Sequence, residues 1–463
     1  MMWRGDTAAA PPPKRPDPPA PVPPATDLPL FRLIARLRTN GLAAWPERAY
    51  REPFLHRRYL GVDSYLVNDP DEARRIFLAD IDTYERPLGF RRLYRPIFGG
   101  GLLVAEGARS RVQRRRMAPA FTARHVEKLI PRFLAVGERM LARLEGKSCA
   151  NLSQAFQDAT IDAVGSAAFS VSLDAVSSRI GAFRSNYFRC GARVSILDHF
   201  ARRESDFLLD YTTRGRAGRT GRAIVAEIIA LRHARPDHEL GAPDLLDLLL
   251  AAQRESTDTL SDEDILDEVA TILGTGFDTS GRSMFWTAFL LALQPEAQAS
   301  VREELRRFPP ASARTLDDLD RWPRLRQCLW EALRLYPPLQ GLVRVPLVPV
   351  EICGRSVAPG AYVAVSPWVM HRHHMLWDRP GAFLPERFPA EAGAAMRVRG
   401  FIPFGMGTRT CIGATFAVTE IVIILAQLLE RYDIALADDR PVLPVSVVTT
   451  VPSAEPMFRL RRL

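Results

Sequence analysis

Cys411, near the C-terminal end of the chain, stands in a setting that could support redox chemistry. It follows the glycine-containing stretch 404–410 and comes directly before the long apolar run 412–432, which is expected to be a buried helix. The free N–H groups and the dipole at the start of a helix stabilise an anion, and they lower the pKa of a thiol placed there. A thiolate is a strong ligand for iron. Cys411 is therefore a candidate metal ligand.

The residues around Cys411 decide between two interpretations of it. A lone cysteine at a helix start is most often a buried structural residue. Here, however, the full pattern FxxGxRxCxG is present, formed by Phe404, Gly407, Arg409, Cys411 and Gly413. This pattern resembles the heme-binding signature of the cytochromes P450, and the resemblance extends over nearly the whole chain. It implies heme b as the cofactor, Cys411 as the metal ligand, and Phe404, Arg409 and Gly413 as further cofactor-binding residues.

A second charged motif precedes the cysteine loop. Glu331 and Arg334 lie three residues apart in an expected helix, 323–336, so they can pair on one face. Alone, such a pair is usually a solvated surface pair of little energetic weight. The later segment FLPERF, 383–388, is similar to the family's PERF segment. The resemblance implies that Glu331, Arg334 and Arg387 form a structural triad behind the heme, with a role in folding and heme retention.

The longest expected helix, 261–293, carries the acid–alcohol pair Asp278–Thr279 within TGFDTS. A threonine hydroxyl inside a helix can bond the carbonyl one turn back and distort the helix locally. This segment resembles the family's oxygen-activation segment, with Thr275 and Asp278 where alanine and glutamate are usual. The resemblance implies that Asp278 and Thr279 are catalytic and supply protons during oxygen activation. The alternative is a core helix that contains glycine and carries a polar patch on its outside.

Several arginines are candidates for binding the heme carboxylates. The stretch 107–121 resembles the family's helix that contacts a heme propionate, with Arg114 retained and Ser110 in place of the usual tryptophan. Arg344 also matches a family propionate ligand. Guanidinium groups form strong charge-assisted bonds to carboxylates, so we expect Arg114, Arg344 and Arg409 to bind the propionates. Each could instead be an ordinary surface arginine. Without the tryptophan, that side of the heme is expected to be wetter.

The elements that must position these residues are mainly helical. The proline-dominated residues 1–27 are expected to form a disordered leader, and 28–463 a single domain. Strand-like runs at 54–59, 64–67 and 342–366 predict a small β portion. The resemblance implies the cytochrome P450 fold, a mainly α domain with a small β-rich lobe. The run 28–37, LPLFRLIARL, could contact a membrane surface or pack onto the body.

Composition narrows the classes of partner and compartment. The chain has 62 Lys and Arg against 53 Asp and Glu, yet no zinc-finger spacing or dense lysine tract, so no nucleic-acid partner is expected. No window is long and apolar enough for a transmembrane segment, and no secretory signal is recognisable. Five cysteines without a CxxC spacing do not form a disulfide framework. We expect a cytoplasmic monomer.

The resemblance implies a monooxygenase that inserts one oxygen atom from O₂ into a lipophilic small molecule. The stretches 84–105 and 339–343 are expected to line its pocket. The chain carries no dinucleotide-binding fingerprint, so electrons from NAD(P)H are expected through a ferredoxin or flavodoxin and its reductase. The expected docking patch is the arginine cluster Arg111, Arg114, Arg115 and Arg116, part of which could face the heme instead. Two alternatives stay open. They are a P450-fold peroxygenase or isomerase, against which the Asp278–Thr279 pair argues, and a non-enzymatic heme sensor.

Overall fold

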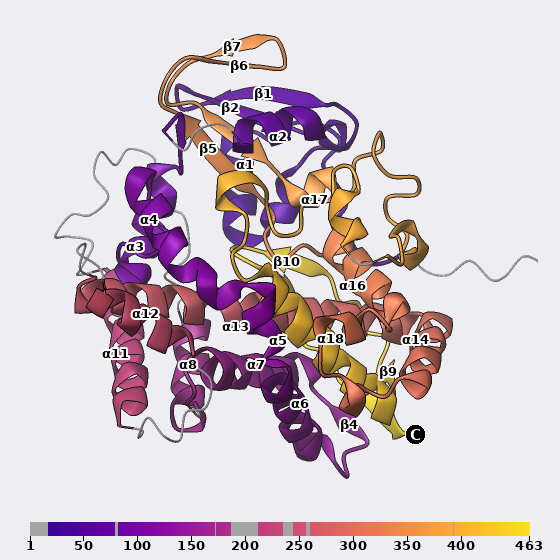
Figure 1. Cartoon of the computed structure of the whole chain (residues 1–463). Coiled ribbons are helices and arrows are strands. Elements are labelled where there is room, and N and C mark those ends of the chain that lie inside the picture. The colour runs from indigo at the N-terminus through magenta and orange to yellow at the C-terminus, as the bar shows by residue number, and fades with distance from the viewer. Residues whose placement is uncertain are drawn as a thin grey trace, which may run out of the picture.

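A long central helix and the helices around it form most of the molecule, and the strands β1, β2 and β5–β7 lie together at one end (Figure 1). The expected mainly α architecture with a small β-rich lobe is therefore confirmed. The computed structural model describes residues 17–78, 82–171, 173–186, 212–234, 244–255, 260–391 and 393–463. The helices are α1 (Leu30–Thr39), α2 (Pro70–Leu78), α3 (Leu88–Phe98), α4 (Gly107–Met117), α5 (Ala123–Glu127), α6 (Ile130–Leu144), α7 (Leu152–Ala163), α8 (Asp174–Asn186), α11 (Thr213–His233), α12 (Leu245–Glu255), α13 (Asp262–Leu293), α14 (Pro295–Arg307), α15 (Leu316–Leu319), α16 (Pro323–Leu335), α17 (Pro367–Met370) and α18 (Ala414–Arg431).

The central helix α13 begins and ends as the sequence predicts. The Ser261 hydroxyl accepts the Asp264 N–H, and the Asp264 carboxylate accepts the Ser261 N–H in return, which completes a capping box. The helix ends at Leu293, just before Pro295 starts α14. Helices α7, α11, α16 and α18 all contact α13. A 32-residue helix therefore runs through the helical body and can present side chains to both a core and a cavity.

The β-rich lobe joins segments from both ends of the chain. Its five-stranded sheet has the order β1-β2-β8-β5-β3, in which β2 and β8 are parallel and the other neighbours antiparallel. The strands of this sheet are β1 (Phe54–Tyr59), β2 (Val62–Val67), β3 (Tyr84–Glu85), β5 (Leu342–Pro346) and β8 (Tyr362–Val365). The remaining strands are β4 (Cys149–Ala150), β6 (Val350–Ile352), β7 (Arg355–Val357), β9 (Tyr432–Leu436), β10 (Pro444–Ser446), β11 (Thr450–Pro452) and β12 (Phe458–Arg462).

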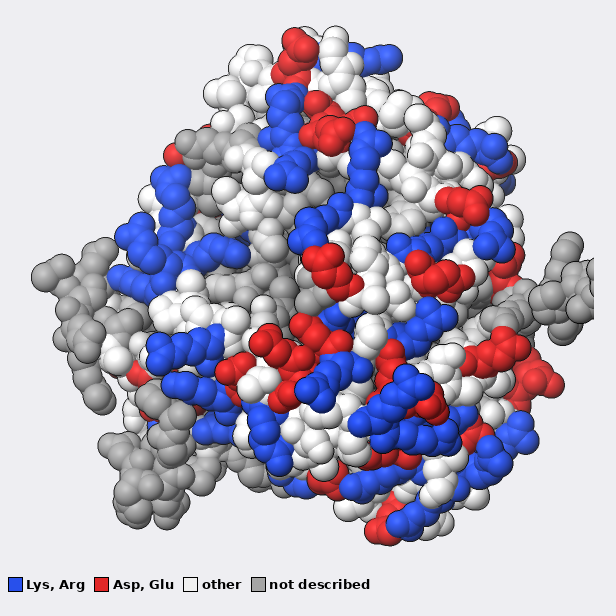
Figure 2. All heavy atoms as spheres, turned by 45° about the vertical axis from the view of Figure 1, so that its right-hand side comes forward, with Lys and Arg blue, Asp and Glu red and all other residues white. Residues whose placement is uncertain are grey.

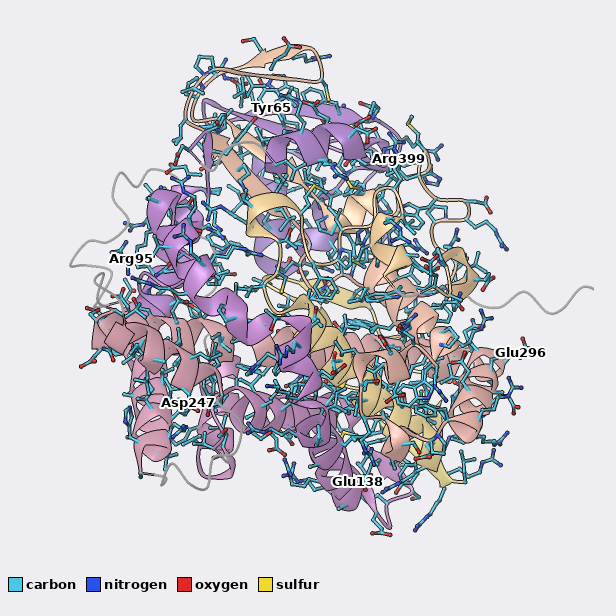
Figure 3. All side chains as sticks on the ribbon, in the orientation of Figure 1. Tyr65, Arg95, Glu138, Asp247, Glu296 and Arg399 are labelled. Carbon is cyan, nitrogen blue, oxygen red and sulfur yellow. The ribbon has the colours of Figure 1, made fainter. Side chains whose placement is uncertain are left out.

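Separate apolar clusters stabilise the body and the lobe. The body packs α6, α7, α13, α16 and α18 around fully buried side chains such as Trp286 and Phe133. Helix α18 is apolar on most faces and buried over most of its length, as its sequence predicts. A smaller cluster around Val363 and Phe77 holds the lobe. Tyr65 in the lobe and Glu138 on α6 mark opposite ends of the molecule in Figure 3.

The structure describes residues 17–27 of the predicted leader 1–27, and the leader itself stays a prediction. Residues 17–27 lie against the body without regular secondary structure. The Tyr336 hydroxyl donates to the Pro19 carbonyl at 2.9 Å, and the Glu47 N–H donates to the Pro24 carbonyl at 2.8 Å. Asp27 pairs with Arg48 at 2.6 Å. Proline composition predicts extended chain correctly, but it does not exclude docking of that chain. Residues 1–16 lie outside the described residues.

The surface carries charges of both signs. Basic and acidic side chains are interspersed over most of the face in Figure 2. The described part of this face lacks the continuous basic stripe that a phosphate backbone would require. No helix in the described ranges combines the length and apolar character that crossing a bilayer needs.

Candidate active site

A cavity of about 880 Å³ lies where α13, α4, the 404–413 loop and the β-rich lobe meet. Both stretches that the sequence predicts to line a pocket contribute to it. Phe90, Leu102 and Leu103 come from the first, and residues 339–343 from the second. Leu33 and Ile34 of α1 also line it. The walls are therefore mostly apolar, as a site for a lipophilic molecule requires.

The cysteine loop delivers Cys411 to this cavity. The Cys411 N–H donates to the Phe404 carbonyl at 2.9 Å, which closes the loop on itself. Gly407 adopts φ +72°, and a Cβ there would clash with the Phe77 carbonyl, so the position requires glycine. The Cys411 side chain is open to the cavity, and Phe404 and Gly413 line the cavity beside it.

Two opposing effects act on the Cys411 thiol. The surrounding protein shields it from bulk water, and this burial raises its pKa. The Gly413 N–H and the positive charge of Arg114 lower the pKa. Helix α18 begins at Ala414, three residues after the cysteine. The thiol therefore has a hydrogen-bond donor and a cation that favour its anionic form when a metal ion replaces the proton.

Four arginines line one part of the cavity: Arg86, Arg114, Arg344 and Arg409, which we name the cavity arginines. Arg114 donates to the Thr410 carbonyl at 2.8 Å, and Arg409 donates to the Ala105 carbonyl at 2.9 Å. Arg344 lies over the Phe77 ring, with 4.5 Å between its guanidinium carbon and the ring centroid. The three arginines predicted from the sequence thus meet at one place, although they come from α4, β5 and the cysteine loop.

The cavity arginines carry more positive charge than the protein balances. Glu106 is the one carboxylate in the described chain that hydrogen-bonds to any of them, and it accepts from both Arg86 and Arg409. Burial and the neighbouring arginines lower the pKa of Arg86 to about 10 and that of Arg344 to about 9. Such a site favours a ligand that brings its own carboxylates. The two propionates of a heme fit this excess of charge.

Helix α13 presents a row of hydroxyls to the cavity. Thr271, Thr275, Thr279 and Ser283 all line it, and each donates to the carbonyl four residues earlier at 2.7–2.9 Å. The Thr279 hydroxyl donates to the Thr275 carbonyl at 2.9 Å, as the sequence predicts. Such bonds compete with the helical hydrogen bonds and loosen the helix locally. The spacing of four residues could have shown the whole row in the sequence.

Asp278 does not face the cavity, although its neighbour Thr279 does. The Thr449 hydroxyl donates to its carboxylate at 2.6 Å, and Arg282 lies 3.6 Å away. Successive residues of an α-helix point about 100° apart, so a side chain next to a cavity-lining one need not share its direction. The expectation that both side chains act together on a ligand in the cavity is therefore not met by this arrangement. A catalytic role for Asp278 stays a prediction.

The residues Glu331, Arg334 and Arg387, which we name the triad, form one hydrogen-bonded cluster centred on the Glu331 carboxylate. Glu331 accepts from Arg334 at 2.7 and 2.8 Å and from Arg387 at 3.2 Å. Its carboxylate also accepts the Leu384 N–H at 2.9 Å. The other Arg334 donors reach the carbonyls of residues 371, 380 and 382. Glu331 and Arg334 are fully buried, and each provides the opposite charge that the other needs inside the protein.

A match to a family model assigns the chain that carries this loop, cavity and triad to a known family. The model described as Cytochrome P450 matches residues 23–455. The chain belongs to the cytochrome P450 family. As a P450, it is an oxidoreductase of the monooxygenase class, in a family that binds heme. The role of Cys411 as the thiolate ligand stays a prediction.

Similarity to individual cytochromes P450 supports this assignment. The chain is 31% identical to Cytochrome P450 4A10 of Rattus norvegicus over 394 residues, which are 80% of this chain and 75% of the relative. It is also 31% identical to Cytochrome P450 4A6 of Oryctolagus cuniculus, over 80% of this chain and 75% of that one. Among solved structures, the heme domain of cytochrome P450DA superposes with a TM-score of 0.78 over 96% of this chain and 98% of that chain, at 22% identity. The retinoic acid-bound cyanobacterial CYP120A1 gives a TM-score of 0.75 over 89% and 92%, also at 22% identity. These two structural likenesses support the P450 fold.

Arg86 lines the cavity, but no sequence motif identified it as a site residue. Its guanidinium lines the cavity and donates to Glu106 and to the Ala105 carbonyl, both at 3.1 Å. No short motif marks it, because its neighbours Arg344 and Arg409 are distant in sequence and only the fold brings them together. Ser110, which replaces the usual tryptophan, is buried and lines the cavity near Arg114. Arg86 is a cation on the same cavity that the family motif does not predict.

Proposed function

We propose that this P450 inserts one oxygen atom from O₂ into a lipophilic small molecule. The observation that carries the proposal is the meeting of Cys411, the cavity arginines and an apolar pocket in one cavity. When bound, a heme b supplies oxygen activation and transfer of the oxygen atom. Cys411 would hold the iron, and the cavity arginines would hold the propionates by charge-assisted hydrogen bonds. Phe404 and Gly413 would border the cofactor at the cysteine loop.

The rest of the cavity would bind and orient the substrate. Phe90, Leu102, Leu103 and the residues 339–343 offer apolar surface, which favours a lipophile and excludes water. Thr279 is the hydroxyl beside this surface that could move a proton. Its Oγ1 would release the Thr275 carbonyl and pass a proton into the cavity.

Asp278 would act as a proton source only after a change in its contacts. Its carboxylate would have to turn from Thr449 toward Thr279. Glu331, Arg334 and Arg387 would act on folding and heme retention rather than on the reaction.

Electrons would come from NAD(P)H through separate partners, a ferredoxin or flavodoxin with its reductase. Helix α4 supports this, because Arg111 and Arg115 are exposed while Arg114 on the same helix faces the cavity. Exposed arginines of this kind suit an acidic donor. We further propose a cytoplasmic monomer in peripheral contact with membranes through α1, whose Phe31 is 69% exposed.

The reduced CO difference spectrum of the purified protein tests the proposal. A strongly red-shifted Soret band is expected for the wild type and for the control Cys149→Ala, which removes an exposed cysteine away from the cavity. Cys411→Ala should lose the band while keeping the fold by circular dichroism. A band that persists in Cys411→Ala would contradict thiolate ligation by this residue.

One observation favours a second candidate, a P450-fold peroxygenase. The Asp278 carboxylate is held away from the cavity by Thr449 and Arg282, so the acid of the acid–alcohol pair is not poised there. An enzyme driven by hydrogen peroxide receives its protons with the oxidant. Turnover with hydrogen peroxide that equals turnover with a ferredoxin and its reductase would support this candidate over the first.

A further inference from the structure

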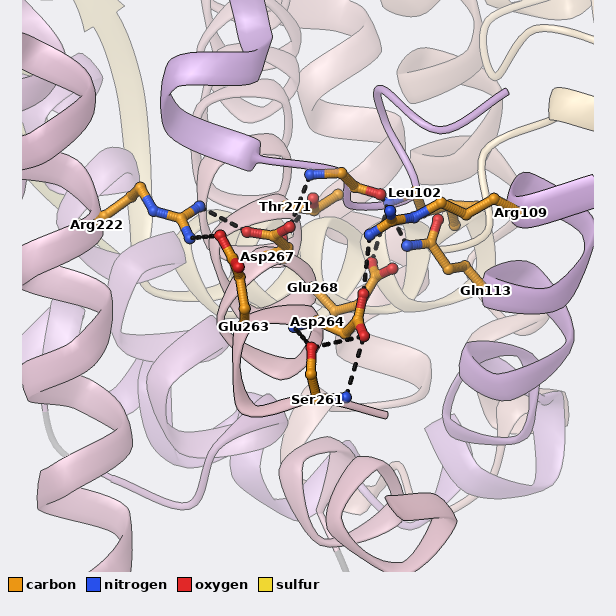
Figure 4. A network of polar contacts seen from close by, with 11 residues as sticks. Leu102, Arg109, Gln113, Arg222, Ser261, Glu263, Asp264, Asp267, Glu268 and Thr271 are labelled. Atoms are coloured by element: carbon orange, nitrogen blue, oxygen red, sulfur yellow. Dashed lines mark hydrogen bonds and ion pairs between the residues drawn. The ribbon is translucent and has the colours of Figure 1, made fainter. Parts of the chain in front are cut away.

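The segment 99–103, between α3 and α4, is held against α13 by acidic side chains (Figure 4). The Gly100 N–H donates to Asp267 Oδ2 at 2.7 Å, and the Leu102 N–H donates to Glu268 Oε2 at 3.1 Å. From the other side, Gln113 Nε2 donates to the Gly100 carbonyl at 2.8 Å. The anchors of this irregular segment therefore include two neighbouring carboxylates on one helix.

The backbone of the segment lies directly on the helix. Gly99 has φ +51°, and a Cβ there would overlap the Asp267 carboxylate. A Cβ at Gly101 would meet the Thr271 hydroxyl and come within 2.7 Å of the Asp267 carbonyl. Glycine is required at both positions because no space remains for a side chain. This close approach leaves the carboxylates of α13 within reach of the N–H groups.

The same segment forms a wall of the substrate cavity. Leu102 and Leu103 line it from one side, and Thr271 and Ile272 of α13 line it next to them. Glu268 lies behind this wall, one turn before Ile272. It therefore acts on the cavity through the position of Leu102.

The surroundings of Glu268 disfavour a charged carboxylate. Its side chain is 2% exposed, and Oε1 has no hydrogen-bond partner in the described part of the chain. Burial and the negative charges of Asp267 and Asp264 raise its pKa to about 7, against the effects of the Leu102 N–H and Arg109. Burying a partly satisfied polar group destabilises a fold, whereas a leucine would pack here without that penalty. The hydrogen bond from the Leu102 N–H is the contact that explains why an acid stands at this buried position.

Nearby ion pairs make this part of α13 a rigid support. Arg109 of α4 pairs with Asp264 at 2.8 Å, and Arg222 of α11 pairs with Asp267 at 2.6 Å (Figure 4). These pairs tie two further helices to the same two turns of α13. Loss of the Glu268 acceptor would consequently free the Leu102 backbone without releasing α4 or α11.

We propose that Glu268 is a positioning residue that fixes the Leu102–Leu103 wall and thereby sets which lipophilic substrates the cavity accepts. The inference rests on the proposed function, because it takes the cavity to be the substrate site. Asp267 and Gln113 hold Gly100 independently, so the effect of Glu268 is centred on Leu102 and Leu103. An uncharged acceptor of the same length would preserve it.

Hydrogen exchange and ligand binding on the holoenzyme test the proposal together. Glu268→Leu removes the acceptor, Glu268→Gln keeps one, and Glu263→Gln is a control on the same helix, where the carboxylate is 79% exposed. In Glu268→Leu, the Leu102 amide should exchange about tenfold faster, as expected for the loss of one such hydrogen bond. Imidazole should bind as in the wild type by its Soret shift, whereas 1-hexylimidazole, which adds an apolar chain for the wall to contact, should bind about tenfold more weakly. Glu268→Gln and Glu263→Gln should match the wild type in both measurements.

Unchanged Leu102 exchange in Glu268→Leu would overturn the proposal, and so would faster exchange with unchanged preference between the two imidazoles. Glu268→Gln behaving like Glu268→Leu would overturn the role of the acceptor. Should Glu268→Leu not fold, the wild type still decides, because a Leu102 amide without protection would contradict the hydrogen bond. Loss of the red-shifted CO band in the wild type would count against the proposed function instead, and it would leave the exchange result valid.

Discussion

The triad and the cavity arginines are both buried charge clusters, yet they differ in how far the protein itself compensates their charges. In the triad, one carboxylate meets two guanidinium groups, and backbone carbonyls take further Arg334 donors. Among the cavity arginines, Arg86 and Arg409 share the single carboxylate of Glu106, and in the described chain the other two hydrogen-bond to no carboxylate. In the first cluster the protein itself supplies the hydrogen-bond partners of the buried charges. In the second cluster the positive charge is balanced only when an anion is added.

This difference separates a folding role from a binding role. A closed cluster stabilises only the arrangement of its own chain, because removal of one member leaves uncompensated buried charge. An open cluster of like charges weakens the ligand-free protein and strengthens the complex. Substitutions in the two clusters should therefore affect different properties of the protein.

Glu331→Gln should destabilise the protein most. It leaves Arg334, which is fully buried, and Arg387 without a counter-charge, and breaking a buried ion pair on one side costs about 3–5 kcal/mol. Chemical denaturation of the holoenzyme measures this change. Glu303→Gln is the matched control, since Glu303 is half exposed and pairs with Arg306 and Arg307 at the surface. A loss below about 1 kcal/mol in Glu331→Gln would show that the triad is not a closed structural cluster.

Arg344→Leu should act on heme rather than on the fold. A hydrogen bond to a charged group contributes about 1.5–3 kcal/mol, so heme should leave the variant roughly 10- to 100-fold faster. Transfer of heme to apomyoglobin measures the rate. The heme-free variant should be at least as stable as the heme-free wild type, because a buried, poorly balanced cation is gone. Arg397→Leu, which removes an exposed arginine paired with Glu391, should change neither quantity.

Glu106→Gln should have the smallest effect, and only in one form of the protein. Without heme, its loss leaves Arg86 and Arg409 with no carboxylate, and the free energy of unfolding should fall by about 1 kcal/mol. With heme, the propionates replace the missing charge and the difference should shrink. Thermal unfolding of both forms provides the comparison. Equal losses with and without heme would contradict the open character of this cluster.

The sequence predicts the parts of the site that rest on local motifs. The pattern from Phe404 to Gly413 places Cys411 correctly on the cavity, and ExxR with PERF gathers the triad. Helix α13 was predicted to within one residue because its capping box and terminal proline are local signals. These features share one property, which is that their key residues are close together in the chain or part of a family pattern.

Features that depend on distant contacts could not be predicted in this way. Arg86 joins the cavity arginines only through the fold, and the direction of Asp278 depends on Thr449 from the C-terminal segment. Residues 17–27 have the composition of disordered chain, but the Pro19 carbonyl accepts a hydrogen bond from the Tyr336 hydroxyl. In each case the deciding partner is more than 150 residues away, where no local pattern points.

The parallel pairing of β2 with β8 has a consequence for how the chain is made. Its register joins Ser64 to Tyr362, so about 300 residues must be synthesised before this edge of β2 is covered. Contacts so distant in sequence close slowly, and an open strand edge is prone to aggregation while it waits. The lobe that walls one side of the cavity is therefore assembled late. A cofactor that is supplied during synthesis finds its pocket closed only after β8 has emerged.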